Sequence, residues 1–88
     1  MIKGETRSGF QFEVEENALD NMELVDALSE AGGDSPIAVS KVVLMLLGKE
    51  QRQKLYDHLR AEDGRVPVVA VSEAMEDVLK AFGGKGKN

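Results

Sequence analysis

The chain lacks cysteine, has one histidine and two prolines, and is poor in aromatic residues, which make up 5% of its 88 residues. Without cysteine it can form no disulfide, thiolate zinc site or iron–sulfur cluster, and it has no cysteine nucleophile. No segment reaches the ~20 apolar residues that a membrane span requires, and the first ten residues hold no apolar run of signal-peptide length. We therefore expect a soluble protein that remains in the cytoplasm.

Motifs that carry catalysis are also missing. The sequence contains no Gly-x-Ser-x-Gly motif, no glycine-rich phosphate loop and no calcium loop with acids at alternate positions. The single histidine, His58, excludes a site built on two histidines and lies between Asp57 and Leu59 in a charged segment, where it is expected at the surface. We therefore expect no enzymatic activity, no cofactor and no bound metal ion.

Basic residues are few, with 11 Lys and Arg against 16 Asp and Glu, a net charge of −5. Because nucleic acid is bound through cations that neutralise phosphates, this chain is a poor candidate for binding it. Residues 1–34 carry nine acids and two bases, whereas residues 35–65 carry four acids and six bases. Regions of opposite sign could orient a partner or a second copy, although acids on a solvated face also serve solubility alone.

The hydrophobic pattern predicts a mainly α (α+β) fold, with an N-terminal β-hairpin and about four helices. Phe10, Phe12 and Val14 alternate with polar residues, as in a half-buried strand, and the turn signal Ser8-Gly9 pairs this strand with residues 2–6. Helices are expected over residues 18–31, 36–47, 49–62 and 72–82. Residues 65–71 are expected to be extended, with room for a short strand. The chain should form one domain over residues 1–82, followed by a flexible Gly/Lys tail over residues 83–88.

Helix starts are assigned from capping residues. Asn17 is expected to cap the first helix, Ser35 the second, with Pro36 at its first position, and Ser72 the last. On the first helix, acids gather on the side opposite the apolar residues. This acidic face consists of Asp20, Glu23, Asp26 and Glu30.

The helix expected over residues 36–47 is apolar almost all round, since Ser40 and Lys41 are its only polar residues. It is too short to span a bilayer, so it must be covered on nearly every side. Either the rest of the fold buries it, or part of its surface binds another protein. The candidate partner-binding residues are Leu19, Val39, Val42, Met45 and Leu46.

The segment Gly32-Gly-Asp-Ser-Pro-Ile37 resembles the attachment site of acyl and peptidyl carrier proteins, in which a serine at a helix N-terminus receives phosphopantetheine. Ser35 would be that serine. Two features depart from the pattern: Pro36 stands where carriers have Leu or Ile, and only residues 32–34 separate the first helix from the serine. An N-cap role explains Ser35 more simply.

A second resemblance covers almost the whole chain. Its strongest segments are the junction Leu46-Leu-Gly-Lys-Glu-Gln51 and the turn Glu62-Asp-Gly-Arg-Val-Pro67, which follow the hairpin segment Gly9-Phe-Gln-Phe-Glu-Val14 and the helical segment from Asp20 to Leu28. In order and spacing these segments are similar to the small tail assembly chaperones of long-tailed phages and prophages of Gram-positive bacteria.

The resemblance implies a non-enzymatic protein of the host bacterial cytoplasm that is absent from the mature virion. Such chaperones bind the tape measure protein, keep it soluble and help recruit tail tube subunits. Their genes often yield a longer product by ribosomal frameshifting, and Gly83-Gly84-Lys85 is compatible with a slippery sequence. A third hypothesis is an acidic inhibitor, whose acidic face imitates phosphates for a basic host protein.

Overall fold

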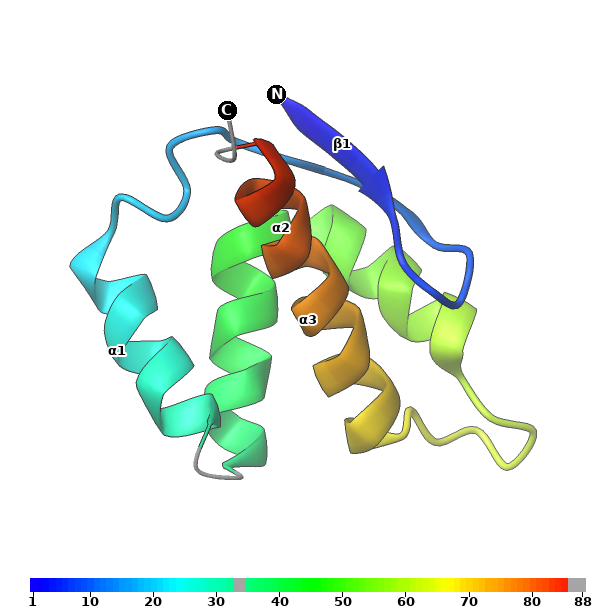
Figure 1. The fold of residues 1–88 in the computed structure, drawn as a ribbon. Helices are drawn as coiled ribbons and strands as arrows, with labels where there is room; N and C mark the ends of the chain where they lie inside the picture. The colour runs from blue at the N-terminus through cyan, green and yellow to red at the C-terminus, as the bar shows by residue number, and fades with distance from the viewer. Residues whose placement is uncertain (33–34, 86–88) are drawn as a thin grey trace.

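A computed structural model describes residues 1–32 and 35–85. Its described residues form a two-stranded antiparallel hairpin and three helices, which confirms a small, mainly helical domain. Figure 1 shows the hairpin alongside α3, with α1 and α3 on either side of the first half of α2. The elements are β1 (Ile2–Glu5), β2 (Gln11–Val14), α1 (Met22–Ala31), α2 (Pro36–Leu59) and α3 (Val68–Lys85).

The hairpin is confirmed where the alternating pattern predicts it. Gly4 pairs with Phe12 across the two strands, and Gly9 takes a φ of 92° in the turn, a conformation that favours glycine. A Cβ added to Gly4 would lie 2.7 Å from Cζ of Phe12, so the aromatic ring lies directly against the glycine backbone. Phe10, Phe12 and Val14 are all buried, and the strand therefore contributes one face to the core.

Helix α2 is interrupted at Gly48, where φ is 79° and ψ is 172°. Glycine tolerates this conformation because it has no Cβ. The helices expected over residues 36–47 and 49–62 are thus the two arms of one element, and the count of four helices is not confirmed. The start of α2 agrees with the sequence: Ser35 Oγ accepts a hydrogen bond from the Ala38 N–H at 3.3 Å, and Pro36 follows the cap.

The predicted start of the first helix is wrong. Helix α1 begins at Met22, and its N-cap is Asn21, whose Oδ1 accepts a hydrogen bond from the Glu23 N–H at 3.0 Å. Asn17 instead accepts a turn hydrogen bond from Asp20 through its carbonyl oxygen. Residues 15–20 are taken up by these turns because the chain must cross from the hairpin to the far side of α2 (Figure 1).

The predicted start of the last helix is also wrong, and the short strand considered before it is absent. Helix α3 begins at Val68, and the Pro67 carbonyl accepts a hydrogen bond from the Val71 N–H at 3.3 Å. A proline next to a helix start loses nothing, because the N–H groups there have no intrahelical partner. The helix continues to Lys85. Residues 86–88 of the expected tail lie outside the described residues.

The core forms where α1, α3 and the hairpin meet α2. Strand β2 packs on α2 and strand β1 packs on α3, while α1 packs on α2 alone among the larger contacts. The most deeply buried large side chains come from all of these elements: Val14, Leu24, Val42, Val43, Leu55 and Val78. No helix within the described ranges is long and apolar enough to cross a membrane.

Candidate functional site

The structure buries most of the predicted partner-binding residues. Val42, Leu46 and Val39 are 1%, 5% and 9% exposed, and Met45 is half-buried. They are core residues because α1, α3 and the hairpin together cover α2. Of the five candidates only Leu19 is classed as exposed, in the turns before α1. These residues do not form one exposed surface on α2, although Val39 and Val42 line a hollow between α1 and α3.

What the structure does present is an apolar depression between α1 and α3, here called the α1–α3 groove. One part of this groove has a volume of about 220 Å³. The lining residues are Leu28, Ala31 and Gly32 of the α1 side, Val39 and Val42 of α2, and Ser72, Met75, Glu76 and Leu79 of α3.

A second hollow, of about 340 Å³, continues the groove toward the N-terminal ends of α2 and α3. The two hollows share Ala31, Val39, Ser72 and Glu76. At this end the groove is bordered by Val68 and Val69, which are 51% and 69% exposed. Large apolar side chains thus reach the solvent where the groove opens.

Helix α1 forms one wall of the groove. Its exposed surface has an apolar part beside the groove and an acidic part on a different flank. Val25 lies three residues before Leu28, so the two are neighbours on the helix surface, and Val25 is exposed. At 100° per residue, Glu23 and Glu30 fall on the flank of α1 away from Val25. All four residues of the predicted acidic face are exposed. None of the four lines the groove, and Asp20 lies before the start of α1, so the predicted face is not a single face of this helix.

The α3 wall carries an acidic rim that is tied to the hairpin. Arg7, in the hairpin turn, donates from its backbone N–H and its Nε to Oδ2 of Asp77, at 2.8 and 3.1 Å, and contacts Glu76 at 3.1 Å and Glu73 at 3.9 Å. These hydrogen bonds from Arg7 lower the pKa of Asp77 below its usual value. Three carboxylates share one guanidinium at this rim, so it remains acidic.

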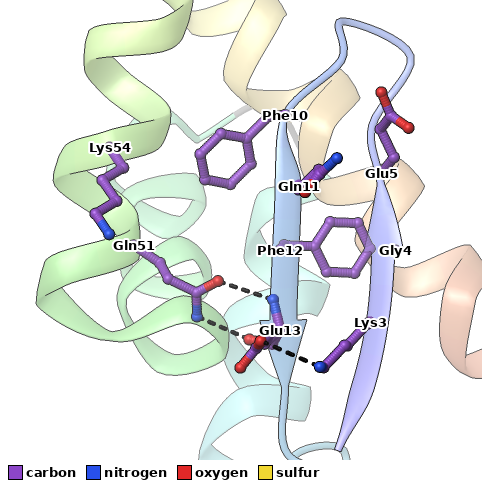
Figure 2. Close-up of a pocket in the computed structure, with 9 residues that line it drawn as sticks. All are labelled: Lys3, Gly4, Glu5, Phe10, Gln11, Phe12, Glu13, Gln51 and Lys54. Carbon is purple, nitrogen blue, oxygen red and sulfur yellow. Dashed lines mark hydrogen bonds and ion pairs between the residues drawn. The ribbon is translucent and has the colours of Figure 1, made fainter.

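Another hollow, of about 710 Å³, lies beside the hairpin and the second arm of α2 (Figure 2). Gln51 Oε1 accepts a hydrogen bond from the Glu13 N–H at 2.8 Å, and its Nε2 donates to the Glu13 carbonyl at 2.7 Å. Gln51 therefore takes the place of a third strand at the edge of β2. Lys3, Lys54 and Glu13 give the hollow mixed charge, and the hydrogen bonds of Gln51 at its edge hold the hairpin to α2.

Ser35 and His58 both have structural partners. Ser35 Oγ is used in the cap of α2. His58 is exposed, as expected, yet its Nε2 donates to the Ser8 carbonyl at 2.8 Å and its ring lies 5.8 Å from that of Phe10. It fastens the second arm of α2 to the hairpin turn. Across residues 1–32 and 35–85, no group of three His, Cys, Asp or Glu side chains is placed to hold a metal ion.

The residues that sequence reasoning missed are Gln51 and the α3 wall. Met75 and Leu79 are four residues apart, so the sequence pattern places them on one apolar stripe. The pattern does not tell whether such a stripe lines a groove or is wholly buried. Comparison of the chain with protein-family models, curated proteins and solved structures found no match. The likeness to tail assembly chaperones therefore rests on the sequence motifs.

Proposed function

We propose that this protein is a tail assembly chaperone of a long-tailed phage or prophage, and that it acts by protein–protein contact without catalysis. The observation that carries the proposal is the α1–α3 groove, which is apolar, lies between two helices and opens beside Val68 and Val69. Grooves of this kind bind amphipathic helices. A tape measure protein, as a long helical chain, exposes apolar stripes until the tail tube surrounds it.

The segments behind the resemblance have structural roles that support this proposal. Gly48 breaks α2, and Gln51 attaches its second arm to the hairpin. Gly64 takes a φ of 92° in the loop before α3, where Asp63 accepts hydrogen bonds from Arg65. These residues hold the domain in shape and supply no reactive group. Such a role is what we expect of conformational residues in a protein that acts by binding. Counted as separate helices, the two arms of α2 make the expected four.

In this proposal the protein works in the host bacterial cytoplasm, binds the tape measure protein, recruits tail tube subunits and leaves before the virion is complete. A frameshifted longer product belongs to the same proposal. Gene order is an independent check: we expect a tail tube gene upstream and a very long tape measure gene downstream. Mass spectrometry of purified virions should detect the tape measure protein and not this chain.

Co-expression tests the proposal directly. The tape measure protein of the same genome should be insoluble alone and soluble with this chain, and the two should co-purify. A tape measure protein that stays insoluble in the presence of a folded, equally abundant chaperone would contradict the proposal. The variant Ser35→Ala lacks the hydroxyl that a carrier protein needs and should still make the tape measure protein soluble, although Ser35 caps α2 and borders the second hollow.

Two measurements decide against the alternatives. A carrier protein would gain the mass of phosphopantetheine on Ser35 when supplied with coenzyme A and a transferase, and we expect no such gain. A phosphate-mimicking inhibitor would lose its partner at high salt or when Glu23 and Asp26 are changed to lysine. A complex held in the α1–α3 groove should keep its affinity when Glu23 and Asp26 are changed to lysine, because neither residue lines the groove.

A further inference from the structure

We infer that the α1–α3 groove binds one amphipathic helix whose apolar stripe is flanked by lysine or arginine. The inference rests on the proposed function in that the tape measure protein would supply the helix. It goes further because it assigns the binding site and the chemistry of the bound segment.

The arrangement of the helices favours a helix as the occupant. Helices α1 and α3 flank the first arm of α2 (Figure 1), and residues of all three helices line the groove. Val39 and Val42 form its floor, while half-buried Leu28 and Leu79 form opposite walls. A helix laid over this groove would contact mainly its walls, because Val39 and Val42 are only 9% and 1% exposed. Its large apolar side chains would fill the two hollows, and Val69 would be covered at the open end.

The charge at the rim of the groove determines which residues should flank the apolar stripe of the bound helix. Glu73 and Glu76 line the groove, and among the described residues that line it none is basic. Two cations, Arg7 and Lys80, act on the three carboxylates of Glu73, Glu76 and Asp77, so the rim keeps a net negative charge. A helix with basic flanks fits this rim, whereas an acidic helix is repelled. The apolar contacts supply most of the affinity, and the charges supply orientation and selectivity.

A second copy of this chain is the competing occupant. Ile37 and Leu44 are exposed and seven residues apart, on the side of α2 opposite Val39 and Val42. This stripe is short and carries one base, Lys41. It matches the acidic rim less well than a helix with several basic residues along the flank that faces α3. Self-association through the groove is therefore treated as an outcome of the experiment.

The probe is a synthetic helical peptide with a leucine stripe, lysine flanks and one tryptophan. Because the chain contains no tryptophan, peptide fluorescence reports binding without background. We expect one peptide to bind per chain. A matched peptide with glutamate in place of lysine should bind about tenfold more weakly or not at all. Equal binding of the two peptides would overturn the assignment of basic flanks.

Paired variants locate the site. Leu79→Gln alters the groove, while Leu44→Gln makes the same change on the opposite side of α2. Because burying a leucine is worth at least about a tenfold change in affinity, Leu79→Gln should weaken the lysine peptide about tenfold or more, and Leu44→Gln by less than about twofold. Leu28→Gln, on the facing wall, replaces Leu79→Gln if thermal melting shows that the latter is unfolded. Equal losses in groove and control variants would overturn the site.

The remaining outcomes separate this inference from the proposed function. If size-exclusion chromatography shows dimers that Leu79→Gln dissociates, the groove belongs to a second copy and the inference fails. If the peptide binds in the groove while the tape measure protein stays insoluble on co-expression, the groove assignment stands and the proposed function fails. If the tape measure protein is solubilised by Leu79→Gln as well as by the natural chain, the function stands and the groove assignment fails.

Discussion

Replacing Gly48 with alanine should destabilise the fold although nothing would touch the added methyl group. Gly48 has a φ of 79° and a ψ of 172°, in a region that is essentially restricted to glycine. No atom lies within 4 Å of a Cβ built there, so the cost is backbone strain of about 1–3 kcal/mol. Alanine also favours an uninterrupted helix over glycine by about 1 kcal/mol. The substitution therefore drives α2 toward a straight helix.

A straight α2 would move its second arm away from the hairpin. The hydrogen bonds from Gln51 to Glu13 and from His58 to Ser8 would be lost. Each kcal/mol of lost stability lowers the melting temperature of a domain this size by about 4–8 °C. We expect Gly48→Ala to melt roughly 5–20 °C below the natural protein in calorimetry, with faster hydrogen exchange at the Glu13 amide.

Gly83→Ala is the matched control. Gly83 lies within α3, is exposed and also has no atom within 4 Å of an added Cβ. Alanine there should raise the stability by about 0.5–1 kcal/mol, because glycine loses more conformational freedom in a helix. Both substitutions add a methyl group to open space. Changes in stability of opposite sign would therefore show that the backbone conformation, and not a steric contact, causes the difference. A Gly48→Ala protein as stable as the natural one would refute the break in α2.

Three further predictions concern the hairpin. Gly4→Ala should lower the free energy of unfolding by about 1–3 kcal/mol, measured in urea, because its Cβ would lie 2.7 Å from the ring of Phe12. Gln51→Leu should cost about 1–3 kcal/mol and expose the Glu13 amide to hydrogen exchange, because the edge of β2 loses two hydrogen bonds. The pKa of Asp77 is lowered in the fold, so its stabilisation is complete above the unfolded pKa of about 3.9 and is lost as the pH falls through the lower folded value. Asp77→Asn should therefore flatten the acid side of the stability–pH curve, and an unchanged curve would contradict this assignment.

The errors at the helix starts have a common physical origin. Asn17 and Asn21 are equally good N-caps four residues apart, and local preference cannot choose between them. The choice is made by the distance that the chain must cover between the hairpin and α1. At α3, the proline that was expected to keep residues 65–71 extended instead stands directly before the helix, where its missing N–H costs nothing.

The predicted partner-binding residues also show that local sequence cannot decide tertiary contacts. Four of the five candidates were placed on the second helix because its circumference exceeds what one narrow stripe could cover. An apolar helix has no polar side to mark which direction faces solvent, so the pattern alone left every side open. Three neighbouring elements cover Val39, Val42 and Leu46, and the groove forms above this buried floor.

Periodicity, capping residues and glycine positions determine the local structure of this protein, because each acts over a few neighbouring residues: the alternation from Phe10 to Val14, the cap at Ser35 and the break at Gly48 are all readable in the chain. Tertiary structure alone decided which apolar side chains are core and which line a groove. Burial depends on segments that are distant in sequence, and only their packing sets α1 and α3 apart on either side of α2.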